Sequence, residues 1–448
     1  MGKAGTVVIL AAGAGTRFLS TLPKVCQPLC GRPLIGWVLD QARALEPERI
    51  VLVVGHGAEV VREAAEREVP PGERGRLAFV LQAERRGTGH AVLQALPELA
   101  QSDPVVVLYG DMPLLRQESL FALCAARTEA RAAMLTAVVG TPRGFGRILR
   151  EDGAFAGVVE EKDATPEQQL LREVNLGVYC FLRADLERFL PRLTNRNAQG
   201  EYYLTDVPAL VRAEGGEVRA LVLEDEREAI GINTIEHLAE ARRELQWRIL
   251  AAHMARGVHI EDPATTYIDH GVEIGAGARI LPCSVIRTGV KVGADCEVGP
   301  FTHLRAGTVL EPGAEIGNFC EAKNARIGEH TKAKHLSYLG DVTIGARANI
   351  GAGTIVANYD GKKKHPTVIG DRAFVGSGSI LIAPCNVGEG ALTGAGAVVT
   401  RNSRVPPGEA WVGVPARPLP PKGVRPPAAE GAPSSAAKPS SGKEKKDP

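Results

Sequence analysis

A period of six residues runs through the second half of the chain. From Ile274 to Ala322 every sixth residue is apolar, and most of the residues between are polar. An α-helix repeats about every 3.6 residues and a half-buried strand at every second residue, so neither element explains this period. A period of six, with glycine often following the apolar residue, is typical of a hexapeptide β-helix, a solenoid of short parallel strands. The apolar positions are Ile274, Ile280, Ile286, Val292, Val298, Leu304, Leu310, Ile316 and Ala322.

The period slips at two places and is interrupted at a third. It shifts by one residue to reach Ile327, shifts again to reach Ile344, and continues to Val356. The segment 358–366 does not fit the repeat, which then resumes and runs to Val399. Because stacked coils leave no room for residues outside the repeat, we predict that 358–366 loops out. With three strands to a turn, the counted positions make about seven coils.

The first half of the chain has a different pattern. Runs that are apolar at every position, at 7–10, 50–54 and 105–108, alternate with helical stretches such as 34–45. Such runs indicate strands buried on both faces, as in a mostly parallel sheet wrapped by helices. The sequence therefore predicts an α/β domain, in which ligands bind beyond the carboxyl ends of the strands.

These patterns divide the chain into four predicted parts. The α/β domain is expected over 1–235, a linker helix over 236–256, the β-helix over 257–420 and a disordered tail over 421–448. The helix has apolar residues at helical spacing, and it could equally be the last packed helix of the first domain. The tail consists largely of Pro, Ala, Ser and Lys, a composition too poor in large apolar residues to build a core.

Composition excludes several classes of function. The 448 residues contain 53 Lys and Arg and 52 Asp and Glu, so no overall field favours nucleic acid or an anionic membrane. The eight cysteines show no zinc-site spacing and are expected to be reduced thiols. No signal peptide or membrane-spanning run is recognisable, which predicts a cytoplasmic protein.

A glycine-rich turn follows the first apolar run. Residues 10–17 read LAAGAGTR, and Leu-Pro-Lys follows shortly after, ending at Lys24. A turn of this kind offers free backbone N–H groups to phosphate oxygens, and Arg17 and Lys24 add positive charge, so the segment is a candidate triphosphate site. It matches neither the dinucleotide-binding fingerprint nor the P-loop. Taken alone, a glycine turn more often only shapes a loop.

An acidic residue, Asp111, stands at the end of the third apolar run. Mg²⁺ is a hard cation that prefers oxygen ligands, so one carboxylate and one amide oxygen beside the phosphates are sufficient protein ligands. Asp111 is therefore the carboxylate candidate for a Mg²⁺ ion bound beside the phosphates.

Several motifs together resemble a known family. LAAGAGTR, Leu-Pro-Lys, Gln-Ala-Glu at 82–84, Gly-Thr-Gly-His at 87–90 and Tyr-Gly-Asp-Met-Pro-Leu at 109–114 resemble the sugar-1-phosphate nucleotidyltransferases. With the solenoid, residues 5–400 resemble the bifunctional N-acetylglucosamine-1-phosphate uridyltransferases and glucosamine-1-phosphate N-acetyltransferases. The resemblance implies a Rossmann-like nucleotidyltransferase domain followed by a left-handed parallel β-helix.

The resemblance also implies the reactions and the partners. Acetyl-CoA would acetylate glucosamine-1-phosphate, and UTP would then convert the resulting N-acetylglucosamine-1-phosphate to UDP-N-acetylglucosamine, a precursor of peptidoglycan and lipopolysaccharide. The partners are these small molecules, without nucleic acid or membrane insertion, and the enzyme is expected to be a homotrimer with acetyl-transfer sites between subunits.

For uridylyl transfer, the resemblance assigns roles residue by residue. Arg17 and Lys24 would act on the phosphates, and Asp111 and Asn233 would bind the metal. The nucleotide and sugar would be bound by Leu10, Ala11, Ala12, Gly13, Lys24, Gln82, Gly87, Thr88, Tyr109, Gly110, Asp111, Gly146, Glu160, Asn175 and Asn233.

For acetyl transfer, the repeat itself supplies part of the argument. Arg305 and Lys323 are one 18-residue turn apart, so they can stack and bind a phosphate. A neutral histidine suits removal of the amine proton, and His335 is the candidate base. The resemblance supports His335 and places glucosamine-1-phosphate at Arg305, Lys323, Tyr338 and Asn349. It places acetyl-CoA at Ala352, Asn358, Tyr359, Ser377, Ala395 and Arg417.

Two departures and two alternatives remain at this stage. Ala14 stands where the family often has a basic residue, and the basic group that meets the CoA phosphates could be Arg417 or the lysines at 362–364. One alternative is a nucleotidyltransferase for another sugar or base with a non-catalytic, trimerising solenoid. The other is a regulatory protein with an inactive transferase domain, against which Lys24, Asp111 and Asn233 argue.

Overall fold

The computed structural model describes residues 4–13 and 15–419. Ala14 and the tail 421–448, predicted to be disordered, lie outside the described residues. The chain divides into two compact units, Met1–Val290 and Lys291–Pro448. The division falls inside the six-residue repeat, so the first unit contains the α/β fold and the first strands of the solenoid.

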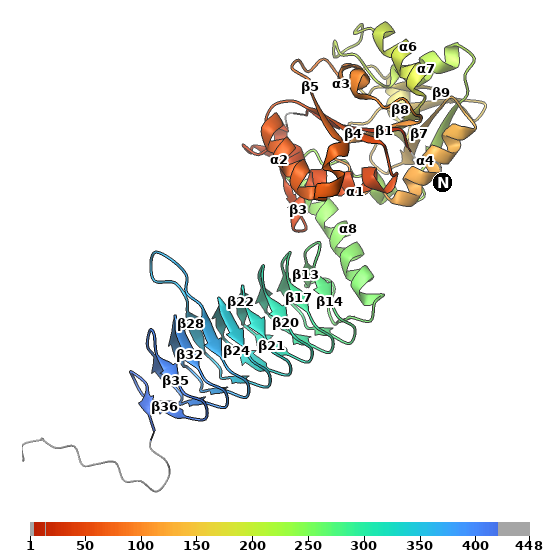
Figure 1. Cartoon of the computed structure of the whole chain (residues 1–448). Helices are drawn as coiled ribbons and strands as arrows, with labels where there is room; N and C mark the ends of the chain where they lie inside the picture. The colour runs from red at the N-terminus through yellow and green to blue at the C-terminus, as the bar shows by residue number, and fades with distance from the viewer. Residues whose placement is uncertain (1–3, 14, 420–448) are drawn as a thin grey trace, which may run out of the picture. The chain divides into compact units, whose positions relative to one another are not determined.

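The first unit is built on a mostly parallel sheet, as predicted (Figure 1). Its strand order is β11-β7-β10-β6-β1-β4-β5, and β1 pairs in parallel with both β4 and β6. β10 runs antiparallel to β6 and β7, and a β8–β9 hairpin continues from it. The strands are β1 (Thr6–Ala11), β4 (Arg49–Val54), β5 (Leu77–Leu81), β6 (Val105–Tyr109), β7 (Ala132–Val138), β8 (Arg147–Glu151), β9 (Ala154–Val159), β10 (Glu173–Phe181) and β11 (Val218–Val222), with a small separate hairpin of β2 (Pro28–Leu29) and β3 (Arg32–Pro33).

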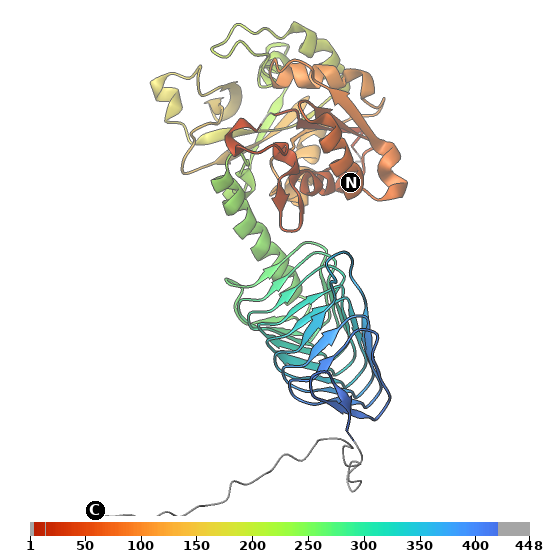
Figure 2. The ribbon, with the colours of Figure 1, turned by 90° about the vertical axis from the view of Figure 1, so that its left-hand side faces the viewer.

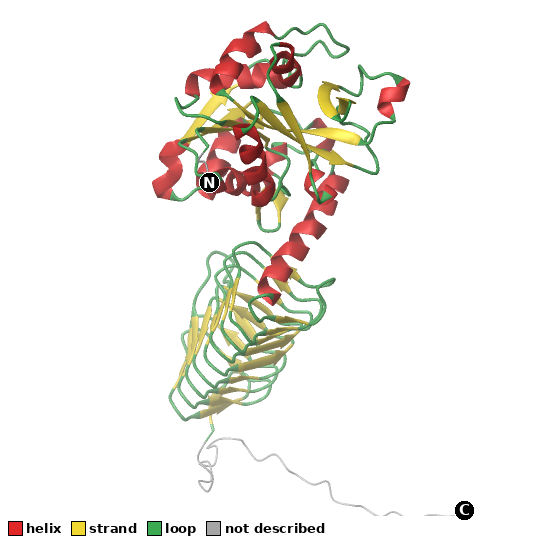
Figure 3. Cartoon of the chain, turned by 90° about the vertical axis from the view of Figure 1, so that its right-hand side faces the viewer, coloured by secondary structure: helices red, strands yellow, loops and turns green. Residues whose placement is uncertain are grey.

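Helices cover both faces of this sheet (Figure 3). Successive strand residues point to opposite faces, so Val7 and Ile9 pack with α1 and α2 residues while Val8 packs with α3 and α7 residues. This double burial explains why the strand sequences are apolar at every position. The helices are α1 (Leu34–Ala44), α2 (Ala58–Glu68), α3 (Thr88–Ala95), α4 (Gln117–Thr128), α5 (Pro166–Gln169), α6 (Arg183–Phe189) and α7 (Asp206–Ala213).

A long helix, α8 (Ile235–Met254), leads to the first strands of the solenoid. The hydroxyl of Thr234 caps its start by accepting from the backbone N–H of His237 at 3.3 Å. Gln246 on α8 exchanges two hydrogen bonds with the backbone of Ile268, which fixes the helix against β13. In this unit β12 pairs with β15 and β13 with β16, both in parallel. The solenoid strands here are β12 (His259–Ile260), β13 (Tyr267–Ile268), β14 (Glu273–Ile274), β15 (Arg279–Ile280) and β16 (Val285–Ile286).

The second unit is a stack of solenoid coils (Figure 2). Up to β36 its strands pair in parallel with the strands three later in the chain, as in β18 with β21 and β21 with β24, and β36 pairs antiparallel with β37. The strands are β17 (Lys291–Val292), β18 (Glu297–Val298), β19 (His303–Leu304), β20 (Val309–Leu310), β21 (Glu315–Asn318), β22 (Glu321–Lys323), β23 (Arg326–Ile327), β24 (Lys332–His335), β25 (Tyr338–Gly340), β26 (Val342–Ile344), β27 (Asn349–Ile350), β28 (Ile355–Ala357), β29 (Thr367–Ile369), β30 (Phe374–Val375), β31 (Ile380–Ile382), β32 (Cys385–Val387), β33 (Leu392–Thr393), β34 (Val398–Val399), β35 (Arg404–Val405), β36 (Ala410–Val412) and β37 (Arg417–Pro418).

The residues of the six-residue count form the inner core of these coils. From Val292 to Val399 every counted position is buried, including those after the two slips. Strands β35 and β36 extend the solenoid beyond the counted run. The segment 358–366 interrupts the coils between β28 and β29 as predicted, and a single bridge joins Tyr359 to Lys364 within it. Among the described residues no helix is long and apolar enough to cross a membrane.

Candidate functional site

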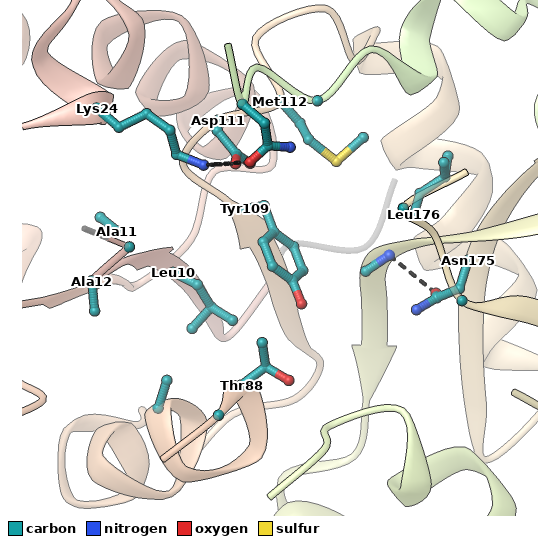
Figure 4. Close-up of a pocket in the computed structure, with 18 of the residues that line it drawn as sticks. Leu10, Ala11, Ala12, Lys24, Thr88, Tyr109, Asp111, Met112, Asn175 and Leu176 are labelled. Carbon is teal, nitrogen blue, oxygen red and sulfur yellow. Dashed lines mark hydrogen bonds and ion pairs between the residues drawn. The ribbon is translucent and has the colours of Figure 1, made fainter. Parts of the chain in front are cut away.

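A cavity of about 390 Å³ opens at the carboxyl ends of β1 and β6 in the first unit. Most of the residues expected to bind nucleotide and sugar line it, although they come from separate parts of the α/β fold. Figure 4 shows Lys24 and Asp111 on one side of Tyr109 and Thr88 on the other. The expected residues that line the cavity are Leu10, Ala11, Ala12, Gly13, Lys24, Gln82, Gly87, Thr88, Tyr109, Asp111, Gly146, Glu160, Asn175 and Asn233.

Two expected residues lie elsewhere. Arg17, in a short 3-10 helix (η1, Thr16–Phe18), is exposed and is not among the residues that line the cavity. Gly110 lies behind the lining, where its N–H donates to the carbonyl of Leu10 at 3.0 Å. A Cβ on Gly110 would approach Val25 Cγ1 to 3.0 Å, so this position favours a residue without a side chain.

The two proposed metal ligands converge on one cation. Lys24 forms an ion pair with the Asp111 carboxylate, and its Nζ donates to the amide oxygen of Asn233 at 3.1 Å. An anionic and a neutral oxygen therefore face one point, a donor set that suits a hard divalent cation. No cluster of three or more His, Cys, Asp or Glu side chains that could hold a metal occurs in the described part of the chain. The Asp111–Asn233 pair is thus the candidate metal site on geometric grounds.

The loop after β5 fixes another wall of the cavity. The buried side chain of Gln82 donates to the carbonyl of Gly87 at 3.0 Å, and the Gln82 N–H donates to Val54 at 2.8 Å. Gly87 has a φ of +103°, and a Cβ there would lie 2.6 Å from the carbonyl oxygen of Tyr202. Glycine at this position therefore allows the close approach of two loops that both contribute to the lining.

A further part of the lining contains a carboxylate and an amide, Glu160 and Asn175. Burial raises the pKa of Glu160, although a hydrogen bond from the Thr205 hydroxyl at 3.2 Å partly opposes the shift. Asn175 donates to the hydroxyl of Tyr179 at 2.8 Å and accepts from the Gly177 N–H at 3.0 Å, so its orientation is fixed. Burial also raises the pKa of Tyr109, and the phenol stays neutral.

Sequence reasoning missed three lining residues with no motif of their own. Val25 and Ala91 are small apolar side chains beside recognised motif residues. Arg85 follows the Gln-Ala-Glu motif directly, but nothing in the local sequence distinguishes it from the neighbouring Arg86. Only its place in the lining separates the two.

In the solenoid, His335 is exposed at the end of β24, opposite Asn318 of β21. Nδ1 of His335 lies 3.2 Å from the side-chain oxygen of Asn318, which can only accept a hydrogen bond. A neutral imidazole that donates from Nδ1 to this oxygen has its lone pair on Nε2. Asn318 was not predicted to have a role.

Three cationic side chains lie near one another beside the coil of His335: Arg305, Lys323 and Lys364. Arg305 donates its backbone N–H to Ala322 at 2.9 Å, which stacks it on Lys323 as the 18-residue spacing predicts. Lys364 and, more weakly, Arg305 lower the pKa of Lys323, because neighbouring positive charges disfavour its protonated form. Arg305 is also paired with Glu321 at 2.6 Å. Lys364, on the segment 358–366, is one of the lysines considered for the CoA phosphates, and it lies close to Lys323.

The remaining expected residues lie on neighbouring coils. A Cβ on Gly340 would lie 2.6 Å from both the Tyr338 hydroxyl and the Asn358 amide nitrogen, so these two side chains meet over it. Ala352, Ser377 and Ala395 occupy equivalent turns of successive coils, as Gly378 donates to Ala352 and Gly396 to Ser377. The other members of the predicted set are partly or fully exposed: Asn349 on β27, Tyr359 on the looped segment and Arg417 on β37.

The two folds and the cavity define a class, a nucleotidyltransferase followed by a hexapeptide-repeat transferase. Residues 7–206 match the model of the MobA-like NTP transferase domain, and residues 366–401 match that of the bacterial transferase hexapeptide (six repeats). A solved structure of UDP-glucose pyrophosphorylase complexed with UDP-glucose is 20% identical, with a TM-score of 0.45, and the match covers 55% of this chain and 100% of that one.

Similarity to curated proteins extends over both units. The Bifunctional protein GlmU of Desulfitobacterium hafniense is 42% identical over 88% of this chain and 93% of its own length. The Bifunctional protein GlmU of Acinetobacter baumannii is 43% identical over 89% of this chain and 93% of its own. The chain therefore belongs to the GlmU family of bifunctional proteins.

This membership confirms the family and the function predicted from the sequence. The chain is a bifunctional transferase for the synthesis of UDP-N-acetylglucosamine, with a nucleotidyltransferase and an acetyltransferase part. Nucleotidyltransferases of this type use a divalent metal ion, and a hexapeptide domain indicates small-molecule substrates and an oligomer. The alternatives with a non-catalytic solenoid or an inactive transferase domain are correspondingly disfavoured.

Proposed function

We propose that the cavity of the first unit joins UTP to N-acetylglucosamine-1-phosphate, and that the coils around His335 acetylate glucosamine-1-phosphate. The single observation that supports the first assignment most directly is the convergence of Lys24, Asp111 and Asn233 at the ends of the buried strands. In uridylyl transfer a sugar-phosphate oxygen attacks the α-phosphorus of UTP while pyrophosphate leaves, so two anions must be brought together.

Within this proposal, Asp111 and Asn233 would hold Mg²⁺, which when bound neutralises phosphate charge. Lys24 adds a positive charge that is already fixed in place, because it is mostly buried and paired on two sides. The wall with Gln82, Gly87 and Thr88 would hold the uridine together with residues 10–13. The wall with Gly146, Glu160 and Asn175 would bind the sugar. Arg17, which is exposed on η1, is proposed to act on the phosphates from outside the lining.

For acetyl transfer, His335 is the proposed general base. The amine nitrogen of the sugar attacks the thioester carbon, the C–N bond forms, and the C–S bond breaks to release CoA. Nε2 of His335 accepts the amine proton, because Asn318 keeps the proton on Nδ1. Arg305 and Lys323 would bind the sugar phosphate with Tyr338 and Asn349. Acetyl-CoA would lie along Ala352, Asn358, Tyr359, Ser377 and Ala395, with Arg417 near its phosphates.

The proposed assembly is a homotrimer. Phe301, Phe319 and Leu336 occupy equivalent turns of successive coils and are 52%, 57% and 61% exposed. A column of large apolar side chains in water is unfavourable, and contact with another subunit would bury it.

We further propose the domain division 1–235, 236–256 and 257–420. A cytoplasmic location is proposed because all eight cysteines are free thiols.

One experiment tests the whole proposal. The protein is supplied with UTP, Mg²⁺, glucosamine-1-phosphate and acetyl-CoA, and UDP-N-acetylglucosamine is measured while each component is omitted in turn. Product should require all four components, and N-acetylglucosamine-1-phosphate should remove the need for acetyl-CoA. Pyrophosphate release that never depends on acetyl-CoA, with no CoA formed from glucosamine-1-phosphate, would refute acetyl transfer.

A further inference from the structure

Arg85 lines the nucleotide cavity and has no role in the function proposed above. It belongs to the strap 82–87 that joins β5 to α3, and this strap is held on both sides of Arg85. On one side, Gln82 bonds to Val54 and Gly87. On the other, the N–H of Tyr202 donates to the carbonyl of Arg86 at 2.8 Å. The backbone that presents the Arg85 side chain to the cavity is therefore fixed.

The charge of Arg85 is available for a ligand. Its neighbours Glu84 and Arg86 pair with each other at 2.5 Å and lie outside the lining. Arg85 itself forms no ion pair or hydrogen bond with any residue in 4–13 or 15–419. Its guanidinium offers five N–H donors, a geometry that binds phosphate oxygens in pairs.

The charge balance of the cavity lining favours a further cation beside the phosphates. Among the described residues that line it, two are cations, Lys24 and Arg85, and three are acids, Asp111, Glu160 and Glu201. Lys24 is already paired with Asp111. Carboxylates in the lining repel a triphosphate, and Arg85 would add to the positive charge of a bound Mg²⁺ in offsetting that repulsion.

We infer that Arg85 binds the phosphate chain of UTP and so determines how strongly the site prefers the triphosphate over the bare nucleoside. This inference rests on the proposed uridylyl transfer. Arg85 lines the cavity without an ion-pair partner in the described part of the chain, whereas Arg86 lies outside the lining and is paired with Glu84. The two adjacent arginines therefore form a matched pair for testing the inference.

The test compares Arg85→Ala with the control Arg86→Ala in the full chain. Arg85→Ala should raise the KM for UTP about tenfold, whereas Arg86→Ala should change it less than about twofold. Arg85→Lys should recover part of the loss and Arg85→Gln should not, because charge is the property required. Acetyl transfer by each variant, measured as CoA release, should equal that of the wild type and shows that the chain is folded.

Inhibition by uridine identifies the part of the nucleotide that Arg85 contacts. Uridine has no phosphates, so its inhibition constant should be the same in the wild type and in Arg85→Ala. Equal weakening of UTP and uridine, or equal KM values for UTP in the Arg85→Ala and Arg86→Ala variants, would overturn the inference. Wild-type protein that forms no UDP-N-acetylglucosamine would instead refute the proposed function, so the two failures are distinguishable.

Discussion

Lys24 and Asp111 form an ion pair in which the two side chains are only 12% and 14% exposed. The amide oxygen of Asn233 accepts from the same ammonium group, although it is 209 residues away in the sequence. Two oxygens from the ends of different segments can thus face one cation. This arrangement supports a metal site at Asp111 and Asn233 with Lys24 beside it.

Asp111→Ala removes the negative ligand and leaves the charge of Lys24 unpaired. We expect uridylyl transfer to fall by about a thousandfold, since stabilisation of phosphate charge is the main contribution to this reaction. Pyrophosphate release at increasing Mg²⁺ measures the loss. Acetyl transfer should be unchanged, and full pyrophosphate release by the variant would sink the metal assignment.

Asn318→Ala removes the acceptor that keeps the His335 proton on Nδ1. The His335 imidazole can then adopt the tautomer that has no lone pair on Nε2. We therefore expect kcat for acetyl transfer to fall about tenfold. This loss is smaller than that expected for His335→Ala, which should be about a hundredfold or greater. CoA release gives kcat, and uridylyl transfer is the internal control. Wild-type kcat in Asn318→Ala would contradict the positioning role.

Much of this site follows from patterns in the sequence. The strand ends beyond the all-apolar runs locate Asp111, and the 18-residue spacing stacks Arg305 on Lys323. The contact between Asn318 and His335 could not be predicted in this way, because it spans 17 residues and arises from the slip in the repeat. The sequence shows that the slip exists but not which side chains it brings together.

Arg85 and Arg17 illustrate a second limit of prediction from sequence, which is the direction of side chains in short loops. Both are basic residues within or next to recognised motifs, yet the structure places Arg85 in the cavity lining and Arg17 outside it. Side-chain direction in a short loop depends on tertiary hydrogen bonds, such as the one between Arg86 and Tyr202. Local sequence does not determine these bonds.

Glu160→Gln should stabilise the protein in a pH-dependent way. Burial raises the pKa of Glu160 in the folded state. Below the unfolded pKa of about 4.3 the carboxyl is protonated in both the folded and the unfolded protein, so it does not reduce the free energy of unfolding there. The cost to folding grows as pH rises from the unfolded pKa toward the raised folded pKa, because folding must then take up a proton, and it is fully present above the folded pKa, where folding buries the charge.

Thermal melting of wild type and Glu160→Gln between pH 4 and 8 measures this difference. The variant should melt about 2 °C higher at pH 8, with the gap closing toward pH 4, and its KM for N-acetylglucosamine-1-phosphate should rise. Glu240→Gln, on the exposed side of α8, should show no such gap. A gap that is independent of pH would contradict the burial argument.

Gly177→Ala should distort the wall that bears Asn175. Gly177 has a φ of +73°, and a Cβ there would lie 2.1 Å from Tyr109 Cε2, so the tyrosine ring must move. Gly153→Ala is a matched control, because Gly153 has a φ of +82° and its Cβ would meet nothing within 4 Å. Backbone strain of about 1 kcal/mol is common to both.

Thermal melting and the KM for N-acetylglucosamine-1-phosphate distinguish the effect of backbone strain from the effect of the steric clash with the Tyr109 ring. Both variants should melt at lower temperature than the wild type, but only Gly177→Ala should raise the KM, by about tenfold or more. Equal KM values in the two variants would show that the Tyr109 ring does not bound the sugar site.

Phe319→Glu tests whether the apolar column is a subunit contact. Phe319 stacks on Phe301 with ring centroids 5.2 Å apart, and both rings are more than half exposed. A carboxylate within a buried subunit contact would remain unpaired, which costs several kcal/mol and should separate the subunits. Light scattering coupled to size-exclusion chromatography should then report a trimer for the wild type and a monomer for the variant.

Acetyl-transfer activity shows whether a separated subunit still contains a complete acetyl-transfer site. If the acetyl-transfer site lies between subunits, the Phe319→Glu monomer should lose CoA release while uridylyl transfer, in the first unit, continues at the wild-type rate. Arg372→Glu is a control on the exposed surface, where Arg372 pairs with Glu389, and should remain trimeric and active. A Phe319→Glu monomer with normal acetyl transfer would show that one chain forms the complete site.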